Sequence, residues 1–106
     1  MRASRLAAIA LLAGCGAAAA QDAAAGKMKA AACAVCHGAN GIAVAPDAPS
    51  LAGQSAIYLA AQLKAYRGGA RKHEVMSVMA RPLSDGEIDD QAAWFASIRV
   101  EATLPK

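Results

Sequence analysis

The sequence predicts an all-α fold, a small domain of three to four helices with two long loops. Three stretches carry apolar residues at helical spacing, and no run alternates with the period of two that a half-buried strand would show. The length of 106 residues indicates one domain. Because 31 residues are alanine, and there are only one Trp, one Phe and two Tyr, the core lacks bulk. Such a chain usually needs a further stabilising element, and a large apolar prosthetic group would serve.

The first 20 residues have the features of a secretory signal peptide. The basic start "MRASR" precedes the apolar run "LAAIALLAG", which is too short to span a membrane. Small residues at Ala18 and Ala20 favour cleavage after Ala20, which would leave residues 21–106 as a single domain. The segment "LAGC" also resembles a bacterial lipobox, in which Cys15 would be lipidated. Both outcomes stay open, and both place the mature protein in the bacterial periplasm, released or tethered to a membrane by lipid.

The net charge argues against nucleic acid or a membrane surface as a partner. The formal charge is +3, and removal of Arg2 and Arg5 would leave +1. No run of Lys and Arg supplies the local positive field that such partners require. The only expected link to a membrane is the possible lipid at Cys15.

The first helix is predicted over residues 23–33, with Asp22 as its N-cap. The second is predicted over residues 56–67, with Ser55 as its cap and Gly68 ending it in the left-handed conformation. One face of this helix carries apolar and aromatic side chains, namely Tyr58, Leu59, Leu63 and Tyr66. Residues 68–82 are expected to form a loop.

The third helix is predicted to begin at Ser84. Ser84 and Glu87 have the spacing of a capping box. A broad apolar face follows on this helix, made of Ile88, Ala92, Trp94, Phe95 and Ile98.

The segment "CAVCHG" has two cysteines and a histidine at a spacing that occurs in three kinds of site. A zinc site usually needs a second ligand pair, and His73 is the only other candidate in the mature chain. A thioredoxin-like redox pair would follow a strand, whereas the preceding residues are helical. Covalent attachment of haem c fits best, because C-x-x-C-H lets Cys33 and Cys36 bond to the haem while His37 reaches the iron.

A second axial ligand is expected from "EVMSVMARPLSD", which offers Met76 and Met79. Loop methionines can also be core filler. His73 is a rival ligand, although a surface role beside Arg71 and Lys72 is favoured for it.

Taken together, four ordered blocks resemble a class I c-type cytochrome, most closely the small bacterial mono-haem periplasmic type and one half of the di-haem members. The blocks are "CAVCHG", "PSLAGQ", "YLAAQLKAYRGGAR" and "MSVMARPLSDGEI", and the resemblance covers about residues 23–98. It implies the cytochrome c fold wrapped around one covalently bound haem c.

The resemblance also implies a role for each matching residue. Cys33 and Cys36 would hold the haem, His37 would be the proximal ligand, and Met76 is preferred over Met79 as the other axial ligand. The carbonyl of Pro49 would accept the ring N–H of His37. The remaining expected positions are Leu51, Gly53, Tyr58, Leu63 and Arg71 at the haem pocket, and Gly26 with Trp94 at the crossing of the first and third helices.

Filled axial positions would leave no site for a substrate, so the expected function is one-electron transfer rather than catalysis. The expected partners are other redox proteins: a quinol-oxidising complex, an oxidase, or a periplasmic dehydrogenase or reductase. The carrier is expected to be a monomer. Two alternatives are a haem-based sensor or catalyst with a labile distal ligand, and a lipid-anchored subunit of a larger redox complex.

Overall fold

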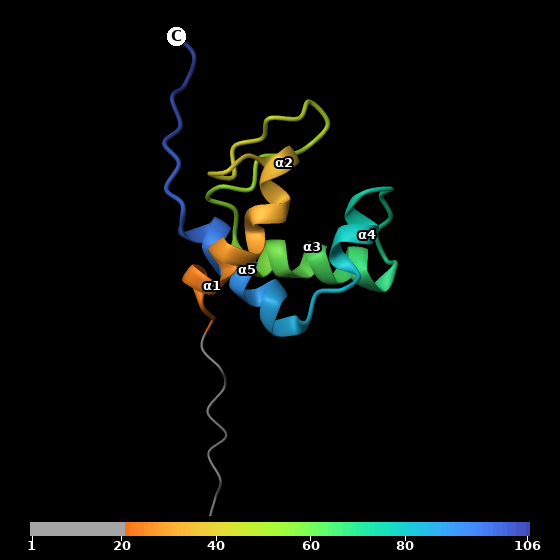
Figure 1. Cartoon of the computed structure of the whole chain (residues 1–106). Helices are drawn as coiled ribbons and strands as arrows, with labels where there is room; N and C mark the ends of the chain where they lie inside the picture. Colours follow the sequence, from red (N-terminus) through yellow and green to blue (C-terminus); the bar gives the residue numbers. More distant parts are fainter. Residues whose placement is uncertain (1–20) are drawn as a thin grey trace, which may run out of the picture.

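The computed structural model describes residues 21–106, which form an all-helical domain (Figure 1). The elements are α1 (Ala23–Lys29), the 3₁₀ turn η1 (Ala30–Cys33), α2 (Ala34–His37), α3 (Ala56–Gly68), α4 (Met76–Ala80) and α5 (Asp85–Ser97). No strand occurs in this range, and the all-α prediction is confirmed. None of these helices combines the length and apolar character needed to cross a bilayer. The predicted signal peptide and Cys15 lie outside the described residues.

The first helical segment is longer than predicted. Elements α1, η1 and α2 follow one another without a break, so the helical path continues past Cys33 to His37. Asp22 caps it as predicted, because its carboxylate accepts the backbone N–H groups of Ala24 and Ala25. Side chains three residues apart lie on one side of a helix. The helical path therefore turns Cys33 and Cys36 toward the same region.

Helix α3 ends one residue later than predicted. Ser55 caps its start by accepting the N–H of Tyr58, but Gly68 remains helical. Gly69 instead takes the left-handed conformation, with φ of 84°. Near this end, the Arg67 guanidinium donates to the Leu83 carbonyl at 2.9 Å and lies 2.6 Å from the Asp85 carboxylate. These contacts join the end of α3 to the start of α5.

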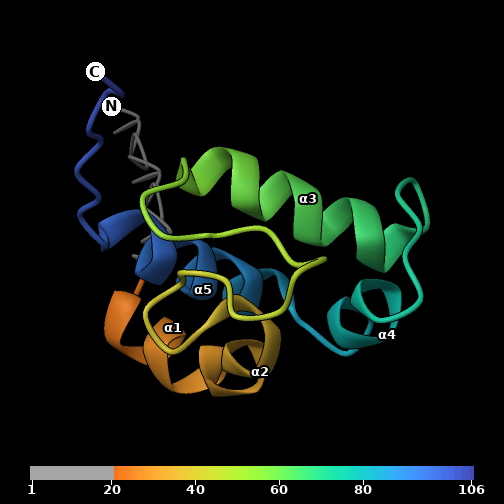
Figure 2. The same ribbon diagram turned by 90° about the horizontal axis from the view of Figure 1, so that it is seen from above.

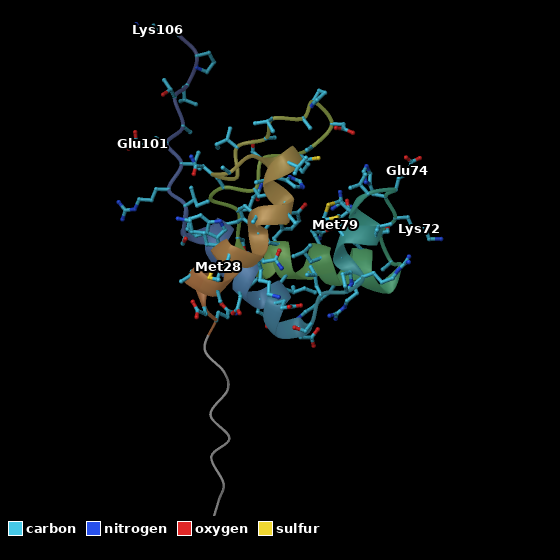
Figure 3. The ribbon with its side chains drawn as sticks, viewed as in Figure 1. Met28, Lys72, Glu74, Met79, Glu101 and Lys106 are labelled. Carbon is cyan, nitrogen blue, oxygen red and sulfur yellow. The ribbon has the colours of Figure 1, made fainter. Side chains whose placement is uncertain are left out.

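The segment after α3 was predicted to be a loop, and that prediction was wrong for α4. Val75, at the start of α4, makes no side-chain cap. The imidazole of His73 caps the helix instead, since its Nδ1 accepts the N–H groups of Val75 and Met76 at 3.2 and 3.3 Å. Figure 3 shows Met79 on α4, with Lys72 and Glu74 on the preceding loop.

Helix α5 begins with the predicted capping box. Ser84 Oγ accepts the N–H of Glu87 at 3.1 Å, and the Glu87 carboxylate accepts the N–H of Ser84 at 3.0 Å. Behind it, Ile88, Ala92 and Phe95 are buried as predicted. Helix α5 packs against both α1 and α3, and it lies between them in Figure 2.

The crossing of α1 and α5 depends on Gly26. A Cβ at this position would lie 1.9 Å from the carbonyl oxygen of Asp90, so only glycine allows this approach. Trp94, one turn further along α5, packs against the core, and the Lys27 ammonium lies 5.2 Å from its ring centroid. This is the close approach of the two helices expected at Gly26.

The carboxylates at the start of α5 predict a loss of stability in acid. The Arg67 guanidinium beside Asp85, through a hydrogen bond and its charge, holds the pKa of that carboxyl below its ordinary value of 3.8. The Lys29 ammonium, by hydrogen bonding, lowers the pKa of Glu87 below 4.5. A group with a lowered folded-state pKa stabilises the fold above its unfolded pKa, and this contribution disappears as pH falls through the folded value.

We therefore expect Asp85→Asn to lower the melting temperature at pH 7 relative to the wild type, and the difference to shrink as pH falls below 3.8. Thermal unfolding between pH 7 and pH 3 measures it. Glu101→Gln is the control, because Glu101 makes no ion pair within residues 21–106. A difference between wild type and Asp85→Asn that stays constant across this range would contradict the prediction.

Candidate haem-binding site

A cavity of about 330 Å³ lies between α2, α3, α5 and the segment before α4. Figures 1 and 2 both show α2 and α4 at opposite ends of α3, with the loop of residues 38–55 passing beside α3. The volume falls within the range of about 300–1,000 Å³ common for ligand and cofactor sites. The lining includes nine residues predicted for the site, namely Cys33, Cys36, His37, Pro49, Leu51, Tyr58, Leu63, Arg71 and Met76.

Two thiols open into this cavity from the end of the first helical segment. Cys33 and Cys36 are partly buried and are not joined in a disulfide. Burial raises the pKa of the Cys33 thiol, so it is protonated at neutral pH. Because neither sulfur is held in a disulfide, both can form a covalent bond to a group in the cavity.

His37 is buried, with 7% of its surface exposed, and the structure fixes the role of each ring nitrogen. Its Nδ1 lies 2.8 Å from the carbonyl oxygen of Pro49. Since a carbonyl can only accept, the proton must be on Nδ1. In the neutral ring the lone pair is then on Nε2, the atom that can bind a metal. A hydrogen bond of this kind orients a histidine ligand and increases its basicity.

The loop that contains Pro49 is tied to the cysteine helix by backbone hydrogen bonds. The N–H groups of Val44 and Ala45 donate to the carbonyl of Cys36 at 3.0 and 3.1 Å. Leu51 and Ala52 donate to the carbonyl of Gly41 at 2.7 and 3.0 Å. This network explains how a Gly- and Pro-containing loop can hold the Pro49 carbonyl in place.

The structure distinguishes the two methionines. Met76 lines the cavity, whereas Met79 does not line it and has 37% of its surface exposed. His73 also lines the cavity, but its Nδ1 accepts the two N–H groups at the start of α4, so in the neutral ring Nε2 carries the proton and neither nitrogen offers a free lone pair. Of the three candidates, Met76 combines a cavity position with an uncommitted donor atom.

Gly53 and Arg71 were both predicted for the haem pocket, but only Arg71 lines the cavity. Gly53 does not line the cavity: its φ is 74°, its N–H donates to the Phe95 carbonyl, and a Cβ there would meet Val100. Gly53 therefore lets the loop pack closely against the end of α5.

Arg71 does line the cavity, and its guanidinium stacks over the Tyr66 ring at 4.7 Å and donates to Gln62 at 2.8 Å.

Gln91 is a cavity residue to which the sequence analysis gave no role. Gln91 is buried, with 2% of its surface exposed, and it lines the cavity from α5. A sequence signal existed, because position 91 lies three residues after Ile88 and four before Phe95. A polar residue on this apolar stripe of a helix marks a buried polar group.

These residues fit haem c by their chemistry. The cavity is largely apolar, two thiols lie at the C-x-x-C spacing, and the Nδ1 of the adjacent histidine is held by the Pro49 carbonyl, which leaves Nε2 as the nitrogen for a metal. A methionine approaches from a separate element, as a second axial ligand would. The fold and site thus define a c-type haem protein.

Comparison with known proteins gives the same result. The family model for cytochrome c matches residues 23–99. Cytochrome c-554(548) of Halomonas halodenitrificans is 49% identical over 79 residues, covering 72% of this chain and 95% of the relative. Cytochrome c4 of Pseudomonas aeruginosa is 48% identical over 86 residues, covering 81% of this chain and 43% of the relative. This chain belongs to the cytochrome c family.

A solved structure shows the same fold. Reduced recombinant cytochrome c4 from Pseudomonas stutzeri superposes with a TM-score of 0.71 at 42% identity, covering 76% of this chain and 47% of that chain. The present chain therefore spans about half the length of the cytochrome c4 relatives and nearly all of cytochrome c-554(548). It is an electron-transfer cytochrome with haem c as its covalent cofactor, similar to one half of cytochrome c4.

Proposed function

We propose that this chain is a one-electron carrier in which His37 and Met76 hold the two axial positions of a haem c iron. The observation that supports this most directly is the hydrogen bond from His37 Nδ1 to the Pro49 carbonyl, in a cavity that Met76 also lines. When bound, the haem supplies a one-electron ferric–ferrous couple.

Each residue of the chain has a defined task in this function. Cys33 and Cys36 anchor the group, so that it stays with the protein in both redox states. His37 and Met76 hold fixed positions on separate elements, which keeps the rearrangement between states small. With both positions held, no exchangeable site is left for a substrate, and we propose that the chain carries electrons without catalysing a reaction.

The partners must be redox proteins, since a carrier both receives and delivers electrons. We propose that they are a quinol-oxidising complex, an oxidase, or a periplasmic dehydrogenase or reductase, met as a monomer in small transient contacts. We place the protein in the bacterial periplasm after removal of residues 1–20. Cleavage after Ala20 would keep Asp22, the N-cap of the first helix, within the mature chain.

Absorption spectra and the intact mass of the bacterially matured protein test the proposal. We expect the oxidised form to show the weak far-red band of a methionine–ferric bond, and the mass to equal residues 21–106 plus one haem. A chain that begins at a lipidated Cys15 would overturn the proposed cleavage. Rapid binding of carbon monoxide by the untreated reduced protein would overturn the carrier function in favour of a sensor or catalyst.

A further inference from the structure

Gln91 is the one polar residue on the buried face of α5 and faces the haem cavity. Its Nε2 donates to the backbone carbonyl of Glu87 at 3.1 Å. Because a carbonyl can only accept, this bond determines which way the carboxamide points. The other end, Oε1, lies 3.6 Å from the sulfur of Cys33. The carboxamide therefore directs its negative end toward a haem-anchoring residue.

The Cys33 thiol is the only hydrogen-bond donor to this oxygen within the described residues. Covalent attachment removes that donor. The S–H bond of Cys33 breaks, an S–C bond forms to one carbon of a haem vinyl group, and the hydrogen goes to the other vinyl carbon, so no oxidant or reductant is required. The thioether that results has no hydrogen to donate. Gln91 Oε1 then becomes a buried acceptor without a donor, which is energetically unfavourable.

A flip of the Gln91 carboxamide does not resolve the missing hydrogen bond. A flipped carboxamide would place Oε1 against the Glu87 carbonyl, so that two acceptors would face each other and the 3.1 Å bond would be lost. The carbonyl end thus stays against the Cys33 sulfur. A buried polar group kept at such a cost, with an apolar residue of similar size available, suggests a role other than stability.

We propose that Gln91 lowers the reduction potential, because its carbonyl dipole at the Cys33 anchor stabilises the more positive ferric state. The dipole acts in a dry wall of the cavity, where it is screened far less than in water. Hydrogen bonding and polarity around a metal centre are established determinants of its potential. The inference rests on the proposed one-electron function and assigns Gln91 as the residue that positions this dipole.

Measurement of the potential in Gln91→Leu tests the role. The substitution removes the dipole and keeps a similar volume. We expect the ferrous-to-ferric ratio at a fixed applied potential to rise threefold to tenfold, and tenfold corresponds to about 59 mV for one electron. Gln91→Met, unbranched and of similar length, should shift the ratio in the same direction. Gln54→Leu is the matched control, since Gln54 lines the same cavity but is exposed to water.

The direction of the shift separates this role from a purely structural one. A loosened cavity admits water, which stabilises the ferric charge and lowers the potential, whereas loss of the dipole raises it. An unchanged or lowered potential in both Gln91 variants, with a reversible couple in the wild type, would overturn the role of Gln91 alone. A wild-type protein without a reversible one-electron couple would overturn the proposed function as well.

Discussion

Met76→Ala is expected to abolish the far-red band of the oxidised protein and to lower the reduction potential. The band arises from the bond between methionine sulfur and ferric iron, so it cannot survive loss of the ligand. Thioether ligation favours ferrous iron, and its removal favours the ferric state. Axial ligands set haem potentials over about 0.8 V, and we expect a fall of at least roughly one tenth of that range. Visible spectroscopy and redox titration of the purified variant measure both effects.

Met79→Ala is the matched control for this prediction, since Met79 lies three residues further on the same short helix and does not line the cavity. It should retain the far-red band and nearly the wild-type potential. The reduced Met76→Ala protein should also bind carbon monoxide rapidly, because a position on the iron is then open. If the band is lost only in Met79→Ala, the assignment of the axial ligand is wrong.

Gly26→Ala is expected to destabilise the domain strongly. The added Cβ would lie 1.9 Å from the Asp90 carbonyl oxygen and 2.9 Å from the Gln91 backbone nitrogen. Both are backbone atoms of a packed helix, so α1 and α5 would have to move apart. Overpacking of this kind costs about 3 kcal/mol at its upper end. For a domain of this size that corresponds to a melting temperature lower by roughly 12–24 °C.

Gly68→Ala provides the control, because it is the same change at the end of a helix with open space around it. No atom lies within 4 Å of a Cβ built at Gly68, and its φ is not positive. Here alanine should stabilise the fold by about 0.4–1 kcal/mol by restricting the unfolded chain. Thermal unfolding of both variants measures the contrast. Equal melting temperatures would show that the helix crossing does not require glycine.

The helix α4 shows why local patterns missed part of the fold. It has only five residues, includes the β-branched Val78, and has no side-chain cap at its start. The imidazole of His73 supplies acceptors for its first N–H groups, and Ser77 Oγ accepts the N–H of His73 at 3.0 Å. Sequence rules for helix starts rely on Ser, Thr, Asp and Asn caps. A histidine cap over such a short element therefore gave no recognisable signal.

The roles of two glycines could not be predicted correctly from the sequence. The predicted left-handed residue at the end of α3 is Gly69 rather than Gly68, and two consecutive glycines give no local reason to prefer either. Gly53 was predicted to face the haem, yet its close neighbours are Ile98 and Val100. In both cases the sequence indicated that a glycine would allow an unusual backbone conformation. Which glycine adopts it, and which residues it packs against, depends on the neighbouring elements.

By itself, the sequence determined the helical class, the capping box of Ser84 and Glu87, and the attachment motif at Cys33, Cys36 and His37. These features depend on residues within four positions of one another, where periodicity and spacing are sufficient. Only the tertiary structure gave the geometry across the cavity: the 2.8 Å distance from His37 Nδ1 to the Pro49 carbonyl, the position of Met76 but not Met79 on the cavity wall, and the 3.6 Å approach of Gln91 Oε1 to the Cys33 sulfur. Those contacts join segments 12 to 58 residues apart, so their geometry depends on how the helices pack.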